Sequence, residues 1–204
     1  EEALGKLGIT YDRLDIFLTH KHHDHCGLAS EYAARGARLF MNPQEDRHCY
    51  DCLYYNHSHG STEDQPQVLQ SVGVTEDGTP EIWNMFMEVN QRIRENRGWE
   101  FEIPGYPYTP VSEGRILNYG DYDLETVGLK GHTYGQMGLY DRNHKILFCA
   151  DQVIDGIVPI VGTTYPDEHL LKGYFDSLEK LKHQYGDCLI LPAHKEPIRD
   201  VKRV

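Results

Sequence analysis

Apolar residues in this chain gather in short runs that have the length of single β-strands. Several of these runs are rich in β-branched, leucine or aromatic residues and stop abruptly at polar ones. The run Ile-Leu-Phe-Cys-Ala at 146–150 is apolar throughout and indicates a buried strand. The predicted strands span residues 15–19, 37–41, 124–129, 136–140, 146–150 and 188–191.

Segments with helical character separate several of these strands. Residues 1–7 look like the end of a helix, residues 28–35 suit a short helix, and Pro43 can begin another at its first position. The clearest helix follows Asp167, which is expected to cap it, and ends near Gly186. Its apolar face consists of Leu170, Leu171, Tyr174, Leu178 and Leu181. Strands that end in polar residues and are separated by helices predict an α/β fold.

Residues 44–110 differ in character from the rest of the chain, because they are rich in Tyr, Asn, Glu and Arg. Apolar side chains recur within them at helical spacing, which predicts one helix. We interpret 44–110 as a helical insertion within a single domain that spans residues 1–204. Two roles fit it: a cap that packs on the core, and aromatic side chains that line a substrate pocket. The apolar stripe consists of Ile82, Phe86, Val89 and Ile93, widened by Trp83 and Met87.

The composition and net charge of the chain limit the kinds of partner that we expect it to bind. A length of 204 residues suits one domain with a sizeable core. The net charge of −12 argues against a general affinity for nucleic acid, which requires a basic surface. No apolar run approaches the roughly 20 residues of a bilayer span, so no membrane partner is expected. The five cysteines lack a disulfide-like spacing and, with no signal peptide evident, predict a cytoplasmic location.

The chemistry of the chain centres on residues 19–25, Thr-His-Lys-His-His-Asp-His, directly after the first predicted strand. In an extended segment, residues two apart share a face, so His20 and His22 can converge on one ion. As the chain turns, Asp24 and His25 can address a second ion. Imidazole suits zinc, and a carboxylate compensates the charge of a dication. A solvated loop or a purification tag is disfavoured, because the cluster is internal, interrupted by Lys and Asp, and preceded by a buried strand.

Three more polar residues stand where predicted strands end, which is where α/β proteins tend to place functional groups. His132 lies in Gly-His-Thr-Tyr-Gly, Asp151 follows Leu-Phe-Cys-Ala, and His194 ends Leu-Pro-Ala-His. Each of them alone would more often be a structural polar residue than a ligand. Their order along the chain and the motifs around them favour a shared site.

Taken in order, His-Lys-His-His-Asp-His, Gly-His-Thr-Tyr-Gly, Leu-Phe-Cys-Ala-Asp and Pro-Ala-His resemble the motifs of the metallo-β-lactamase superfamily. The chain is most similar to its glyoxalase II-like branch, with two mild departures: Ala193 replaces the usual glycine, and Tyr134 stands where proline is common. The resemblance implies an αββα sandwich that binds two divalent ions, with zinc expected and iron or manganese as alternatives. By the same resemblance, one ion would be bound by His20, His22 and His132 and the other by Asp24, His25 and His194, with Asp151 bridging both.

The start of the chain departs further from the family pattern. Members normally open with β-strands that end in an Asp-Thr-Gly-like turn before the first helix. This chain begins at that helix, which predicts that the opening strands are lacking. An incomplete first half would weaken the closure of the sheet and the support of the metal ligands.

The resemblance implies a metal-dependent hydrolase in which a hydroxide bridging two zinc ions attacks a carbonyl group. Asp24 is the expected catalytic residue, because it can orient the hydroxide and move its proton. The expected substrate is a small ester, thioester or lactone, selected by the insertion. Lys21 and Tyr134 are candidate auxiliaries, although exposed, non-catalytic roles are favoured for both. The oligomeric state is left open, with a homo-oligomer as one alternative.

Other functions fit these residues less well. Flavodiiron oxygen reductases place an acidic residue where His22 stands, which disfavours a redox iron pair. A nuclease or phosphodiesterase of the same fold would need a basic or RNA-binding surface. A non-catalytic metal-binding scaffold is disfavoured because nothing indicates a closed four-ligand site. A further metal site is only weakly indicated by Cys49, Cys52, His48, His57 and His59.

Overall fold

The computed structural model describes residues 2–47, 69–70, 73–95, 105–161 and 168–199. The chain divides into two compact units, one of residues 1–48 with 105–204 and the other of residues 49–104. All candidate metal ligands belong to the larger unit. The smaller unit lies within residues 44–110, whose role as an insertion stays a prediction.

A three-stranded parallel sheet forms the first layer of the larger unit. Its order is β1 (Asp15–Leu18), β2 (Arg38–Met41) and β3 (Thr109–Pro110). Helix α3 (Ala29–Ala34) connects β1 to β2, since parallel neighbours require a crossover connection. Helix α1 (Glu2–Leu7) precedes β1. The helices and strands predicted for this part of the chain are confirmed, with ends that differ by a residue or two.

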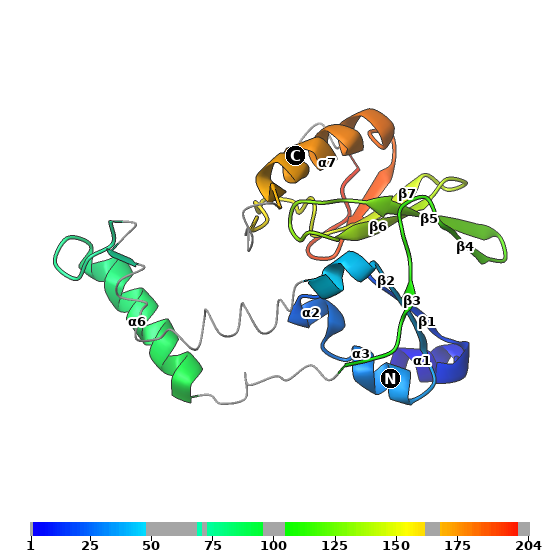
Figure 1. The fold of residues 1–204 in the computed structure, drawn as a ribbon, viewed down its shortest axis with the longest axis horizontal. Coiled ribbons are helices and arrows are strands. Elements are labelled where there is room, and N and C mark those ends of the chain that lie inside the picture. The colour runs from blue at the N-terminus through cyan, green and yellow to red at the C-terminus, as the bar shows by residue number, and fades with distance from the viewer. Residues whose placement is uncertain (1, 48–68, 71–72, 96–104, 162–167, 200–204) are drawn as a thin grey trace. The chain divides into compact units, whose positions relative to one another are not determined.

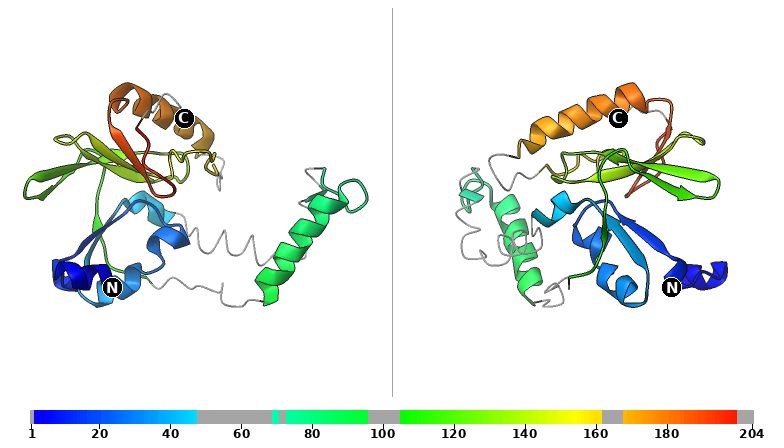
Figure 2. Two further views of the ribbon diagram at one scale, coloured as in Figure 1. Left: turned by 180° about the vertical axis from the view of Figure 1, so that it is seen from behind. Right: turned by 45° about the vertical axis from the view of Figure 1, so that its right-hand side comes forward.

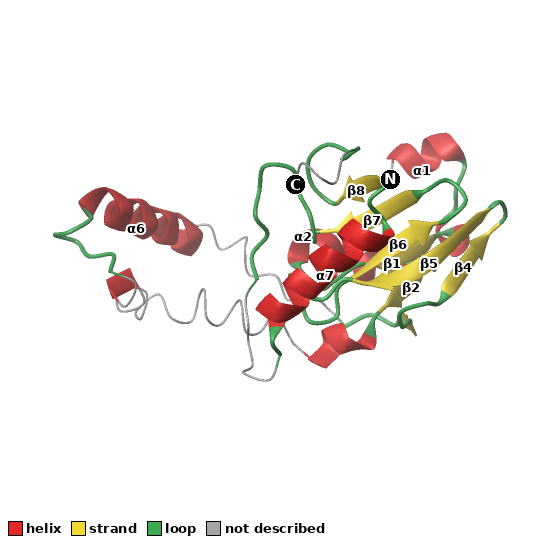
Figure 3. Ribbon diagram, turned by 90° about the horizontal axis from the view of Figure 1, so that it is seen from above, coloured by secondary structure: helices red, strands yellow, loops and turns green. Residues whose placement is uncertain are grey.

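The second layer is a five-stranded sheet in which an antiparallel meander is extended by one parallel strand. In order across the sheet, the strands are β4 (Ile116–Tyr119), β5 (Tyr122–Gly128), β6 (Met137–Asp141), β7 (Ile146–Ala150) and β8 (Leu189–Pro192). The parallel pair β7 and β8 requires a crossover, which contains helix α7 (Leu170–Gln184). Figure 3 shows α7 lying over one face of this sheet.

The two sheets face each other, and helices cover their outer sides (Figures 1 and 2). Phe40 of the first sheet packs with Met137 of the second in a buried cluster that joins the layers. A larger cluster, which includes Leu147 of the sheet and Leu181 of α7, fills the space between the second sheet and its helix. Burial of these apolar side chains stabilises the layers by roughly 1.5–3 kcal/mol for each side chain. This is an αββα sandwich, so the predicted fold class is confirmed.

Helix α7 differs from its prediction at the start and at one side chain. It begins at Leu170, after the left-handed residue His169 (φ 49°), whose side chain makes no capping hydrogen bond. The predicted cap, Asp167, lies outside the described residues. Leu170 and Leu181 are buried as predicted, whereas Leu171 is 58% exposed. One residue turns an α-helix by about 100°, which carries Leu171 away from the face of Leu170.

The smaller unit contains the predicted helix as α6 (Pro80–Glu95), with proline at its first position. Trp83 is buried, whereas Ile82 and Phe86 are 44% and 42% exposed. The buried face of α6 is therefore centred closer to Trp83 than to Ile82 and Phe86, the residues of the predicted stripe. Outside the described part lie the side chains of Val89 and Ile93 and the residues His48, Cys49, Cys52, His57 and His59.

Several short elements were not apparent in the sequence pattern. Strands β3 and β4 contain few buried side chains, so they lack the apolar runs that mark the other strands. Pro43 begins a 3-10 helix, η2 (Pro43–Arg47), in place of an α-helix. None of the helices in the described part of the chain combines the length and apolarity that a bilayer crossing requires.

Candidate metal centre

The histidine-rich motif follows β1 as an irregular segment and then turns into a helix. His20 and His22 lie in the irregular segment, and the single turn α2 (His23–Cys26) follows them. Asp24 and His25 lie in this turn. This turn of the chain lets one short segment contribute to two neighbouring candidate ligand sets, His20 with His22 and Asp24 with His25.

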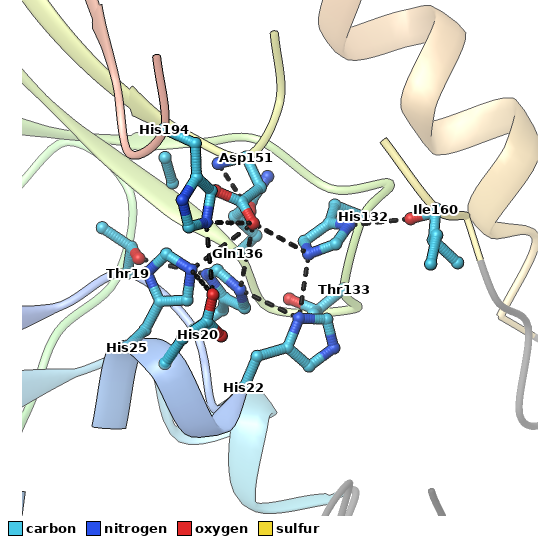
Figure 4. A network of polar contacts seen from close by, with 12 residues as sticks. Thr19, His20, His22, His25, His132, Thr133, Gln136, Asp151, Ile160 and His194 are labelled. Carbon is cyan, nitrogen blue, oxygen red and sulfur yellow. Dashed lines mark hydrogen bonds and ion pairs between the residues drawn. The ribbon is translucent and has the colours of Figure 1, made fainter. Parts of the chain in front are cut away.

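Three residues at strand ends of the second sheet meet this motif. His132 lies in the loop between β5 and β6, Asp151 directly follows β7, and His194 closely follows β8. Because β7 and β8 are parallel neighbours, they end at the same edge of the sheet and bring Asp151 close to His194. Figure 4 shows these three side chains converging with the histidines of the first motif. All the predicted ligands therefore lie together in the folded chain.

His20, His22 and His132 form what we call the first ligand group. The Nε2 atoms of His20 and His132 lie 3.1 Å and 2.9 Å from Nδ1 of His22. A tetrahedral ion with zinc–nitrogen bonds of about 2.0–2.1 Å would hold such nitrogens about 3.3 Å apart. His20 is fully buried, which removes competing water from its ring. The type of these donors and their closeness fit a bound divalent metal ion.

Asp24, His25 and His194 form what we call the second ligand group. Oδ2 of Asp24 lies 3.2 Å from Nε2 of His194 and 3.5 Å from Nε2 of His25. The side chains of Asp24 and His194 are 58% and 44% exposed, in contrast to the buried rings of His20 and His132 in the first ligand group. The second ligand group is therefore the one more open to solvent.

The carboxylate of Asp151 lies between the two ligand groups (Figure 4). Its Oδ2 atom is 3.4 Å from Nε2 of His25 and 3.4 Å from Nε2 of His132. The same oxygen lies 3.7 Å from Nε2 of His194 and 3.9 Å from Nε2 of His20. Burial alone would raise the pKa of Asp151, but the neighbouring histidines, His25 above all, outweigh it and lower the pKa. Asp151 is therefore an ionised carboxylate that faces both groups.

Two buried polar atoms of the cluster have no hydrogen-bond partner among the described residues: Nε2 of His25 and Oδ1 of Asp151. A buried polar atom without a partner costs free energy, so such atoms in a native fold need an explanation. Imidazole nitrogens and carboxylate oxygens are the ligands that zinc and related divalent ions take in proteins. The residues present thus fit divalent metal ions bound at this cluster.

The protonation of the histidines differs between the two ligand groups. Burial, reinforced by repulsion from His132, lowers the pKa of His22 to about 4. Burial and repulsion from the neighbouring histidines hold the pKa of His20 far below its usual value. Burial also lowers the pKa of His132. At neutral pH these imidazoles are uncharged, which is the form that binds a dication. Burial acts in the same direction on His25, but the nearby Asp151 carboxylate outweighs it and raises the pKa.

Contacts from outside the cluster orient two of the histidine rings. Nδ1 of His132 lies 2.7 Å from the carbonyl oxygen of Ile160, which assigns the proton to Nδ1 as the donor. Nε2 of His132 is then the unprotonated nitrogen that faces the cluster. Nδ1 of His20 lies 3.1 Å from Oγ1 of Thr19. Histidines that bind metals almost always engage their other nitrogen in this way, which fixes the ring and its tautomer.

The ligand loops also pack closely against helix α7 and against each other. A Cβ atom placed on Gly131 would lie 2.5 Å from Cα of Tyr174, and Gly131 has a φ of 152°. Glycine is the residue that this approach admits. Nε2 of Gln136 donates to Oε1 of Gln152 at 3.0 Å, and the backbone N of Asp151 donates to Oε1 of Gln136 at 3.4 Å. These contacts tie the loop that holds His132 to the loop that holds Asp151.

A buried carboxylate that sequence reasoning missed, Glu45, lies in η2 beside the first ligand group. Its Oε1 accepts hydrogen bonds from the backbone N of Gly135 at 2.6 Å and from Oγ1 of Thr133 at 2.8 Å. Its Oε2 accepts one from the backbone N of Lys21 at 2.9 Å. No signal in the polar run Asn-Pro-Gln-Glu-Asp-Arg marks Glu45, because its partners are distant in the sequence.

The two candidate auxiliaries make contacts that do not involve the ligands. Nζ of Lys21 donates to Oδ1 of Asp46 at 3.0 Å, and Asp46 also accepts a hydrogen bond from the hydroxyl of Tyr108. Nζ of Lys130 lies over the ring of Tyr134, 4.2 Å from its centroid. These contacts agree with the non-catalytic roles favoured for Lys21 and Tyr134. The expected exposure is wrong, because both residues are half-buried in contacts with their neighbours.

An αββα sandwich with this cluster at its strand ends defines a protein class that binds divalent metal ions. The chain belongs to the metallo-β-lactamase superfamily, whose sequence profile matches residues 14–194. Whether it falls in the glyoxalase II-like branch stays a prediction.

Curated relatives of the chain share a short stretch of sequence with it. Acyl-coenzyme A thioesterase MBLAC2 from Gallus gallus is 42% identical over 53 residues, which are 26% of this chain and 19% of the relative. The protein of the same name from Homo sapiens is 38% identical over 63 residues, which are 29% of this chain and 23% of the relative. The matched stretch is therefore less than a quarter of the length of these relatives.

Solved structures show the same fold at low sequence identity. A metallo-β-lactamase family protein from Thermus thermophilus has a TM-score of 0.69 at 23% identity, covering 100% of this chain and 62% of that one. A β-lactamase domain protein from Burkholderia ambifaria has a TM-score of 0.67 at 22% identity, covering 99% of this chain and 56% of that one. The chain spans less than two thirds of the length of both structures.

Proposed function

We propose that this chain carries the active site of a hydrolase that uses two zinc ions to cleave a small thioester. The observation that supports the proposal most is the position of Asp151, whose Oδ2 atom lies within 3.9 Å of histidines from both ligand groups. A carboxylate so placed suits two neighbouring cations better than one, because its charge compensates both.

When bound, a pair of divalent ions supplies a hydroxide at neutral pH and polarises the carbonyl of a substrate. The chain provides the rest of the chemistry. The first and second ligand groups hold the ions, and Asp151 contributes negative charge between them. Asp24 is proposed as the catalytic residue, since its exposed carboxylate can orient the attacking oxygen and hold its proton.

The choice of a thioester rests on the curated relatives, which are named for the hydrolysis of acyl-coenzyme A. Esters and lactones present the same electrophilic acyl carbon and belong to the same proposal. A phosphodiester is the alternative substrate class, and the net charge of −12 gives it no support from the surface as a whole. We also propose that residues 44–110 select the substrate, because all the proposed ligands lie outside them.

The proposal is tested by elemental analysis and a substrate panel on the full chain supplied with Zn²⁺. We expect about two ions per chain, hydrolysis of acyl-coenzyme A or simpler thioesters, and loss of turnover on chelation that Zn²⁺ restores. Protein that folds but retains no metal would contradict the two-metal site. Metal-loaded protein that cleaves phosphodiesters and no acyl compound would contradict the substrate class alone.

Replacing Asp24 with asparagine should lower kcat about a hundredfold, because asparagine cannot accept the proton of the attacking oxygen. The first ligand group does not include Asp24, so at least one ion per chain should be retained. Asp176→Asn is the control, since Asp176 is an exposed carboxylate of α7 that pairs with Lys172. Full turnover by Asp24→Asn would show that its proposed role is wrong.

Acid should release the ion of the second ligand group before that of the first. The pKa of His25 is raised in the metal-free protein, so an ion at the second ligand group must compete with a proton on His25. At the same pH, the histidines of the first ligand group are already unprotonated. Below the pKa of His25, the affinity of the second site should fall by up to about tenfold per pH unit. Elemental analysis after dialysis at pH 7, 6 and 5 measures this. Release of both ions in one step would contradict it.

A cytoplasmic location also stays a prediction. Cys26, Cys149 and Cys188, the cysteines in the described part of the chain, are buried and form no disulfide with one another, which supports a reducing compartment.

A further inference from the structure

Glu45 links the two loops that carry the first ligand group, and we infer that it is a positioning residue for the metal ion bound there. This inference rests on the proposed two-metal site and goes beyond its ligand set. Glu45 is fully buried, and the three hydrogen bonds described for it all end at groups other than ligand side chains. Its effect on the metal is therefore exerted through its neighbours.

Each residue that donates a hydrogen bond to Glu45 is close in sequence to a proposed metal ligand. The backbone N of Lys21, which donates to Oε2, stands between His20 and His22. The donors to Oε1 are Oγ1 of Thr133, directly after His132, and the backbone N of Gly135. The Glu45 carboxylate thus fixes the distance between the loop that follows β1 and the loop that holds His132, which are far apart in the sequence.

The surrounding packing leaves these loops little room to adjust. A Cβ atom on Gly135 would lie 2.9 Å from Oε1 of Glu45 and 3.0 Å from Cβ of Gln44. Nδ2 of Asn42 donates to the carbonyl oxygen of Gly135 at 2.8 Å. The last glycine of Gly-His-Thr-Tyr-Gly is therefore needed for the close approach of η2, and this approach brings Glu45 to its donors.

A carboxylate suits this position better than its amide. Burial raises the pKa of Glu45, but both of its oxygens accept hydrogen bonds from backbone N–H groups, and these bonds favour the ionised form. Hydrogen bonds to a charged acceptor are stronger than neutral ones. Glutamine offers one oxygen and one NH₂ group, so one of the two N–H donors would face another donor. Alanine would leave both N–H groups buried without a partner, and the loops would have to separate to hydrate them.

The test measures Zn²⁺ affinity by competition with a chromophoric chelator in the wild type, Glu45→Ala, Glu45→Gln and Asp141→Ala. Asp141 is a matched control: it is also buried, and it accepts hydrogen bonds from the backbone N of Asn143 at 3.0 Å and of His144 at 3.2 Å. It lies at the end of β6, away from the ligand loops. Melting temperatures of the metal-free proteins are recorded beside the affinities.

We expect Glu45→Ala to weaken the binding of Zn²⁺ at the first ligand group, the site expected to bind more tightly, by about 10–100-fold. Glu45→Gln should have an intermediate affinity. Asp141→Ala should lower the melting temperature but leave the affinity within about twofold of the wild type. Wild-type affinity in a folded Glu45 variant, or an equal loss in Asp141→Ala, would overturn the inference. If Glu45→Ala does not fold, Glu45→Gln decides alone. Wild-type protein that binds no Zn²⁺ would instead refute the proposed function.

Discussion

Replacing Asp151 with alanine is expected to remove both metal ions and to lower hydrolysis by at least about a hundredfold. Its Oδ2 atom lies 3.4 Å from nitrogens of both His25 and His132, one from each ligand group. Without this carboxylate, the two dications would lose the negative charge that faces both ligand groups. Elemental analysis and thioester turnover, measured on the same preparation, provide the two readouts.

Asp151→Asn separates the charge of this side chain from its shape. Asparagine retains one oxygen and a similar volume, so it should keep part of the metal, whereas alanine keeps neither the charge nor the ligand atom. If Asp151→Ala held two ions with wild-type affinity, Asp151 would not lie between them, and the arrangement proposed for the site would be wrong.

Replacing Gly131 with alanine is expected to destabilise the fold by roughly 2–4 kcal/mol, through overpacking and an unfavourable φ together. The new Cβ atom would lie 2.5 Å from Cα and 2.7 Å from Cβ of Tyr174, so helix α7 or the ligand loop must move. For a chain of this size, the melting temperature should fall by roughly 5–15 °C. Because His132 is the next residue, metal affinity should fall as well.

Gly120→Ala is the control for this substitution. Gly120 also has a positive φ, 66°, but nothing lies within 4 Å of a Cβ atom placed there. Gly120→Ala should lower the free energy of unfolding only by the cost of the unfavourable φ, about 1 kcal/mol. Equal melting temperatures for the two variants would show that the contact with Tyr174 contributes nothing.

The sequence predicts those features of the site that are local or recur as motifs. The alternation of His20 and His22 follows from extended backbone, and the strands before His132, Asp151 and His194 are visible as apolar runs. The long-range pairing of these strand ends could be inferred only from the resemblance to a known family. Spacing alone does not determine which loops of a chain meet.

Features that depend on tertiary contacts could not be predicted in this way. Glu45 is one charge in a polar run, and its burial depends on donors in two distant loops. Leu171 shares the apolar character of Leu170, but its exposure depends on where α7 meets the sheet. Strand β4 has one buried side chain, Leu117, so its place in the sheet follows from pairing with β5 and not from an apolar pattern of its own.

The parallel pairing of β2 with β3 makes residues 42–108 a single crossover connection within the first sheet. The hydrogen bond from Tyr108 to Asp46 joins the end of this connection to its start. Most of this connection is the smaller unit, residues 49–104, and none of the proposed metal ligands lies in it. Substitutions within that unit could therefore change a substrate preference encoded there without replacing any residue proposed to bind a metal ion.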